Sequence, residues 1–128
     1  MIKNNRLIIP PGDAAGIRRQ VLLGLAGNRT PGFHFPGHFL QLDWPRIGAD
    51  AIVETMRAGA HCRNADGGIN LAALGMMLDT ALATAPRLKI ETGARQATVQ
   101  LSAQFTGHPA RGDLSMDCLL YTSDAADE

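Results

Sequence analysis

Asp79 is the residue of this sequence best placed to do chemistry, because it lies inside the long apolar stretch 69–85. On a helix, its neighbours one turn away offer no partner for a carboxylate. They are Gly75, Met76, Leu82 and Ala83. A buried carboxylate without a partner is costly. We therefore expect Asp79 either to meet a group from elsewhere in the fold or to face a site where it acts as a base or nucleophile.

A glycine pair, Gly67 and Gly68, precedes this apolar stretch. Glycines at a helix start let a substrate approach backbone N–H groups, which lie at the positive end of the helix dipole. Such groups can stabilise the oxyanion of a reacting carbonyl, so Gly68, and with it Gly67, fits either an oxyanion donor or a tight turn. Asp66 fits a helix N-cap. Asn64 fits a turn residue or a ligand for a substrate carbonyl or water.

Two helices are predicted from the apolar periodicity and from the residues that break it. Residues 67–85 are apolar on most of a helical circumference, which predicts a central helix buried on most sides and ending at Pro86. Residues 13–27 predict a shorter amphipathic helix that packs on the domain. Its apolar positions are Ile17, Val21, Leu22 and Leu25.

The strands are predicted around the central helix. Residues 39–44 and 49–57 read as an antiparallel hairpin, with Glu54 on the same strand face as Ile52 and Met56. Residues 96–105 alternate most cleanly and predict the best strand of the chain. Another strand begins at Leu114 after a turn rich in glycine and proline. This order of elements predicts an α+β domain with an antiparallel sheet.

The composition is that of a globular domain of 128 residues with no net charge. Charge balance gives no reason to expect a nucleic-acid partner, and the apolar stretch is too short and interrupted for a membrane span. The start of the chain lacks the apolar core of a signal peptide, so we expect a cytoplasmic protein. His34, His38 and His61 lack the spacing of a zinc site. We expect no metal and no cofactor.

The end of the chain, CLLYTSDAADE at 118–128, resembles the translation of a transposase sequencing adapter. We therefore expect a single natural domain over 1–117, cut near Asp117, followed by a non-native tail. The last strands of the sheet are then expected to be missing. A cut sheet exposes an unpaired edge, so we expect this chain to be less stable than its parent and prone to associate.

The stretch DGGINLAALGMMLDTALATA, the alternating ATVQLSAQF and the turn at Gly112-Asp113-Leu114 together resemble the hotdog-fold acyl-CoA thioesterases, closest to the phenylacetate-pathway type. The resemblance covers roughly 39–114. It implies a curved antiparallel sheet wrapped around one central helix. It also implies a homodimer or dimer of dimers with active sites at the dimer interface, and hydrolysis of acyl-CoA to a free acid and coenzyme A.

The resemblance carries the family's catalytic carboxylate to Asp79. The family's helix begins with a His-Gly-Gly turn, for which two registrations are open. One keeps the glycines as Gly67-Gly68 and puts Asp66 at the His position, with about one extra helical turn before Asp79. The other keeps the family spacing and puts Asn70 at the His position. We therefore expect Asn64, Asp66, Asn70 and Met76 to contact the substrate.

Three other functions are left open by the sequence. The first is a hotdog protein that binds acyl thioesters without hydrolysing them, since the His of the turn is absent. The second is a hydroxyacyl dehydratase or hydratase, because residues 34–39 are similar to a His-Phe-Pro stretch of hotdog dehydratases. That stretch leads into the central helix in those enzymes, whereas here it precedes the hairpin. The third is an interaction domain without a ligand.

Overall fold

The structure is a computed structural model that describes residues 2–3, 6–7, 11–27 and 35–120. Most of the predicted tail, residues 121–128, and the greater part of the loop before Phe35 lie outside these ranges. The element order is β1 (Ile2–Lys3), β2 (Arg6–Leu7), α1 (Pro11–Gly27), α2 (Phe35–Leu40), β3 (Asp43–Ile47), β4 (Ala51–Met56), α3 (Leu71–Arg87) and β5 (Leu114–Leu119). Strands β1 and β2 form a separate two-residue ladder.

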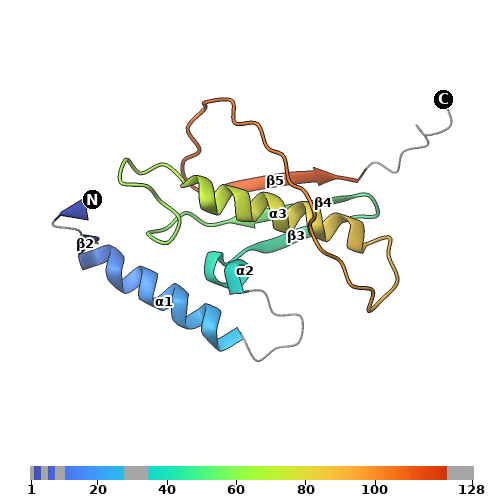
Figure 1. Cartoon of the computed structure of the whole chain (residues 1–128), viewed down its shortest axis with the longest axis horizontal. Helices are drawn as coiled ribbons and strands as arrows, with labels where there is room; N and C mark the ends of the chain where they lie inside the picture. Colours follow the sequence, from blue (N-terminus) through green and yellow to red (C-terminus); the bar gives the residue numbers. More distant parts are fainter. Residues whose placement is uncertain (1, 4–5, 8–10, 28–34, 121–128) are drawn as a thin grey trace.

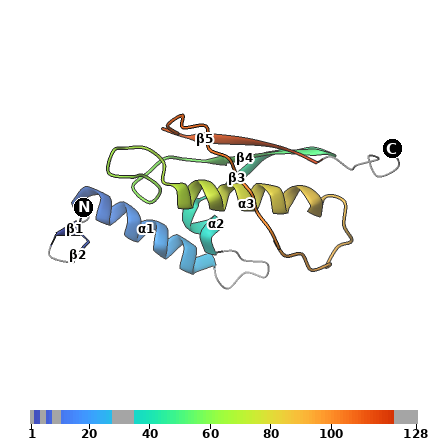
Figure 2. The same cartoon turned by 45° about the horizontal axis from the view of Figure 1, so that its top comes forward.

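The main sheet is antiparallel, has three strands and runs in the order β3-β4-β5. Figure 2 shows this sheet as one layer, with α3 lying along one of its faces. The predicted α+β class is therefore confirmed, and so is the predicted hairpin, which pairs β3 with β4. The strand predicted to begin at Leu114 is present as β5 and continues to Leu119, two residues into the adapter-like segment.

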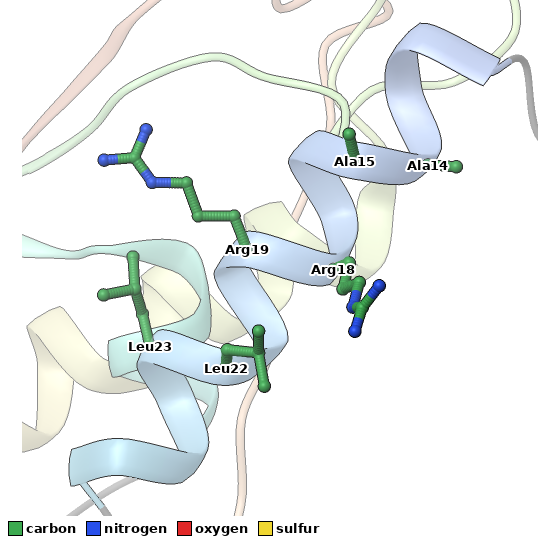
Figure 3. A pocket seen from close by; sticks show the side chains of 6 residues that line it. All are labelled: Ala14, Ala15, Arg18, Arg19, Leu22 and Leu23. Carbon is green, nitrogen blue, oxygen red and sulfur yellow. The ribbon is translucent and has the colours of Figure 1, made fainter.

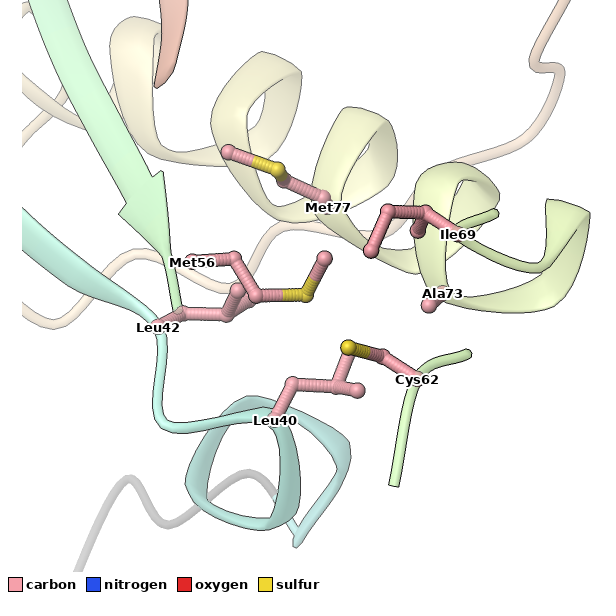
Figure 4. Packing of buried hydrophobic residues seen from close by; sticks show 7 residues of the cluster. All are labelled: Leu40, Leu42, Met56, Cys62, Ile69, Ala73 and Met77. Carbon is pink, nitrogen blue, oxygen red and sulfur yellow. The ribbon is translucent and has the colours of Figure 1, made fainter. Parts of the chain in front are cut away.

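The sheet face beneath α3 follows the alternation of β4, where Ile52, Glu54 and Met56 are buried. Met56 joins a cluster with Met77 and Ala73 of α3, together with Leu40, Leu42, Cys62 and Ile69 (Figure 4). A second cluster lies towards the other end of α3 and contains Ile52, Ala81, Ala85 and Cys118. The core is thus the interface between one helix and one sheet face, which fixes the orientation of α3.

Helix α3 begins four residues later than predicted. Asn70 is its N-cap and accepts a hydrogen bond from the Ala73 N–H at 2.7 Å. Gly67 has a φ of +82°, a left-handed conformation that suits glycine and interrupts a helix. Residues 63–69 instead form a closed loop, and Arg63 and Ile69 form a β-bridge. The helix also continues through Pro86 and ends at Arg87. A proline in the last turn removes one backbone hydrogen bond, but it does not by itself stop the helix at the preceding residue.

The first strand of the hairpin was also predicted too early. Phe35–Leu40 form α2, Gln41 ends it with a φ of 51°, and β3 starts only at Asp43. The strand then runs through Pro45, at a bulge where the pairing with β4 is irregular. A proline has no N–H to donate, and it is tolerated here because it lies at a bulge of an edge strand.

The predicted strand 96–105 is not a strand in the structure. Strands β3 and β5 pair with the two edges of β4. Residues 96–105 lie against α3 instead. Figure 1 shows this segment, in orange, crossing α3. Side-chain bonds hold it there: Gln96 Nε2 donates to the Ala83 carbonyl at 2.8 Å, and Thr98 is bound to α3 as well. Its apolar face is left uncovered, with Val99 97% exposed.

The N-terminal helix is present, but its predicted apolar face is only partly covered. Helix α1 packs on α2, where Gly24 is buried against the Phe35 ring. A Cβ at position 24 would lie 2.7 Å from that ring, so the contact requires glycine. Leu22 and Leu25 are more than half exposed, which the amphipathic prediction did not foresee. They form an open apolar surface, because among the described helices and strands α1 packs mainly against the short α2.

Candidate active site

Asp79 lies on the side of α3 that is turned away from the sheet. It is two residues from both Met77 and Ala81, which are fully buried against the sheet, so it is on nearly the opposite face of the helix. The side chain is half-buried, and its Oδ1 accepts a hydrogen bond from Thr98 Oγ1 at 2.7 Å. Its second oxygen has no hydrogen-bond partner among the described residues. The sequence predicted a partner or a reaction site, and the structure provides one oriented oxygen and one available oxygen.

The glycine pair lies in the loop before α3, with its amide groups already engaged. Gly67 N–H donates to the Asn64 carbonyl at 3.0 Å, and Gly68 N–H donates to Asp66 Oδ1 at 2.9 Å. Asn64 N–H donates back to the Gly68 carbonyl at 2.6 Å. Asp66 therefore caps a turn and not the helix. Arg111 donates to the Asp66 carbonyl at 2.8 Å, which closes the loop from outside.

Asn70 and Met76 do meet, at an open cavity of about 250 Å³ beside the first two turns of α3. The same cavity is lined by Pro36, Phe39, Leu40, His61, Ala72 and Ala73. Asn70 uses its Oδ1 to cap the helix, so its amide NH₂ remains available for a ligand. Asn64, Asp66 and Asp79 do not line this cavity. The predicted substrate-contacting residues are therefore divided between the loop and the cavity.

His61 is a cavity residue that the sequence did not single out for this role. Its ring is edge-on to Phe39, with the ring centroids 5.8 Å apart. Burial lowers the pKa of His61, the nearby Leu40 carbonyl acts in the opposite direction, and the positive charge of Arg63 lowers the pKa further. The imidazole is thus neutral near pH 7. The only sequence signal was its position shortly before the helix.

A second apolar cavity, of about 350 Å³, lies between α3, the segment 102–105 and β5. Leu74 and Leu78 line it from the helix, and Met116 lines it from the sheet. Leu78 is the immediate neighbour of Asp79. An apolar group in this cavity would therefore lie beside the turn of helix that carries the carboxylate.

Glu54 is a buried carboxyl group in the core, 0% exposed. Burial raises its pKa to about 7, and the Thr80 hydroxyl and the nearby Trp44 indole N–H act in the opposite direction. Thr80 Oγ1 lies 2.9 Å from Glu54 Oε1. The sequence pattern put Glu54 on the same strand face as Ile52 and Met56, and the structure shows that this face is buried. Its chemical role was missed because one polar residue in a strand pattern carries little weight.

Helix α1 carries a surface depression of about 550 Å³ that is lined only by its own side chains (Figure 3). They are Ala14, Ala15, Arg18, Arg19, Leu22 and Leu23. Among the described residues no second element lines this depression, so we do not assign chemistry to it. In the part of the chain that the structure describes, no helix has the length and apolarity needed to cross a bilayer. The described residues also contain no group of three His, Cys, Asp or Glu side chains arranged to hold a metal ion.

Comparison of this chain with protein-family models, with curated proteins and with solved structures found no match.

Proposed function

We propose that this chain is a hotdog-type domain that hydrolyses acyl-CoA thioesters, with Asp79 as base or nucleophile. The observation that carries the proposal is the state of the Asp79 carboxylate. One of its oxygens is fixed by Thr98, and the other is available, on the face of a central helix that points away from the sheet. Such a fixed carboxylate suits proton transfer or direct attack on a carbonyl carbon.

The reaction needs a base and a leaving group. Asp79 takes a proton from water, the resulting hydroxide attacks the thioester carbon, and the C–S bond of the tetrahedral intermediate breaks. The proton held by Asp79 then passes to the departing thiolate. The products are the free acid and coenzyme A, and no further reactant is needed. In the covalent variant, an Asp79 oxygen attacks the thioester carbon and the C–S bond breaks, which releases the coenzyme A thiolate. Water then cleaves the mixed anhydride to the free acid and the Asp79 carboxylate, and the proton released goes to the thiolate.

The oxyanion needs backbone donors, and the start of α3 supplies them in place of Gly67 and Gly68. The N–H groups of Leu71 and Ala72 have no acceptor among the described residues, whereas both glycine amides are engaged in the loop. The helix dipole adds positive charge at the same place. This arrangement favours the registration in which Asn70, and not Asp66, occupies the position of the family's His.

One chain cannot bring these donors and Asp79 to the same carbonyl group. Asp79 is eight positions after Leu71, which corresponds to about 12 Å along a helix axis. A second copy with its α3 antiparallel to the first would place the helix start of one chain beside the Asp79 of the other. The proposed enzyme is therefore a homodimer, with the apolar cavity beside Leu78 as the place for the acyl group.

The test is release of thiol from a panel of short, long and aromatic acyl-CoA substrates. We expect Asp79→Asn to reduce kcat by on the order of 10²–10⁴-fold, as for the loss of a general base. Thr98→Val, which removes only the hydroxyl that orients Asp79, is expected to reduce kcat by about tenfold or less. Equal activity of Asp79→Asn and the unchanged chain would refute the proposed role.

Binding of acyl-CoA without hydrolysis is the second candidate, favoured by the engaged glycine amides and by Asn70 in place of a histidine. A dimer that binds acyl-CoA but releases no thiol would support it. Hydration of an enoyl-CoA without thiol release would instead indicate the hydratase alternative.

A further inference from the structure

Glu54 lies at the centre of the contact between the sheet and α3, in a position that no part of the proposed hydrolysis uses. It is on β4 between the buried residues Ile52 and Met56, and it is itself 0% exposed. A buried carboxyl is expensive unless each of its oxygens is paired or its charge is removed. Its surroundings therefore decide in which protonation state it is stable.

Thr80 contacts Glu54 from the helix side. Its hydroxyl has one proton to donate, and three acceptor oxygens lie within reach of it. Its Oγ1 lies 2.9 Å from Glu54 Oε1 and 3.0 Å from the main-chain carbonyls of both Met76 and Met77. A protonated Glu54 resolves this competition. The carboxyl then donates its proton to Thr80 Oγ1, and Thr80 donates its own to a helix carbonyl. An ionised Glu54 can only accept, so the helix carbonyls lose the Thr80 proton.

The contact on the other side is Trp44 of β3. Two buried polar atoms here have no hydrogen-bond partner among the described residues, namely Glu54 Oε2 and Trp44 Nε1. One is an acceptor and the other is a donor. The indole N–H is close enough to favour the ionised form of Glu54, and so to lower its pKa. An ionised Glu54 therefore has a ready second donor that a protonated Glu54 does not need.

We propose that Glu54, Thr80 and Trp44 form a proton-controlled contact between the sheet and α3. With the carboxyl protonated, Glu54 is held by Thr80 alone; on ionisation the Trp44 indole is drawn in to donate to Oε2. This inference does not depend on the proposed hydrolysis.

The burial of Glu54 places this change near neutral pH, since its pKa is raised to about 7. The titratable group that faces it from β5 is the Cys118 thiol, whose pKa is raised by burial and by the Glu54 charge. That thiol therefore stays uncharged over the relevant range. Trp44 also lines an open cavity of about 470 Å³ with Leu23 of α1 and His38 of α2. Movement of the indole towards Glu54 changes a wall of that cavity.

The experiment uses the fluorescence of Trp44, the single tryptophan of the sequence. In the full chain, with circular dichroism recording that it stays folded, we expect a sigmoidal change in Trp44 emission with a midpoint near pH 7. Glu54→Gln keeps the shape of the side chain and removes its ionisable carboxyl group, so the transition is expected to disappear. Glu91→Gln, an exposed matched change, is expected to leave it intact. His38→Gln is the second control, since the His38 imidazole lines the same cavity as Trp44.

Two results would overturn the inference: no transition in the unchanged chain, or a transition that persists in Glu54→Gln. If Glu54→Gln does not fold, carboxyl-carbon NMR of the unchanged chain and of Trp44→Phe decides instead. Loss of the indole N–H should raise the midpoint of the buried glutamate, by a few tenths of a pH unit or more. An unchanged midpoint in Trp44→Phe would show that the indole takes no part.

Discussion

The Glu54 carboxyl gives the free energy of unfolding a defined dependence on pH. Its pKa is raised from 4.5 to about 7 in the fold, so the folded chain holds a proton that the unfolded chain releases. Its contribution is complete below pH 4.5, decreases as the pH rises, and is lost above about pH 7. The difference between these two pKa values corresponds to on the order of 3 kcal/mol. Denaturant unfolding at several pH values should show this decrease in the unchanged chain and its absence in Glu54→Gln.

His61 contributes with the opposite sign. Burial lowers its pKa below 6.5 in the fold, so the unfolded chain takes up a proton that the folded chain resists. Its contribution to stability is complete above the unfolded pKa and decreases as the pH falls through that value. His61→Phe keeps an aromatic ring beside Phe39 and should make the unfolding free energy less sensitive to acid. A steeper acid dependence in this variant would contradict the assignment.

At the scale of a single element, the first residue of α3 offers a selective test of the oxyanion donors. Asn70 has φ −73° and ψ 150°, an extended conformation that a following proline accepts, and proline suits the first position of a helix. Leu71 is 62% exposed. Leu71→Pro should therefore change the unfolding free energy by less than about 1 kcal/mol, while removing one N–H.

If Leu71 donates to the oxyanion, this variant should reduce kcat by on the order of 10²-fold or more with little change in KM. Leu71→Ala, which keeps the N–H, is its matched control. Equal turnover of the two variants would exclude Leu71 as the donor and leave Ala72.

At the scale of the whole molecule, we expect the uncovered segment 96–105 to make the chain prone to associate. Its sequence alternates like a strand, yet it pairs with no strand in the described structure, and Val99 and Phe105 are 97% and 57% exposed. Such a segment is a template for pairing with another chain. Val99→Lys should lower the associated fraction in sedimentation or light scattering and leave the melting temperature within a few degrees. Leu25→Lys, an equivalent change on the exposed face of α1, should have a smaller effect.

Several features of this protein were determined by the sequence alone, because they depend on neighbours along the chain. The long apolar helix, the helix over 11–27, the hairpin and the last strand were all predicted, with errors of a few residues at their ends. These errors at the ends arose because local turn conformations replaced the first residues of the predicted helix and strand. The Asx turn at Asp66 and the left-handed Gly67 moved the start of α3 to Leu71, and Gln41 separated α2 from β3.

Other features were decided only by the tertiary structure, because they depend on which surfaces meet. The clean alternation of 96–105 could not predict that β3 and β5 already occupy both edges of β4. The sequence identified Asp79 but not its partner Thr98, nineteen residues further along the chain. Glu54 acquires its raised pKa only when α3 covers β4, since desolvation arises from packing and not from sequence neighbours.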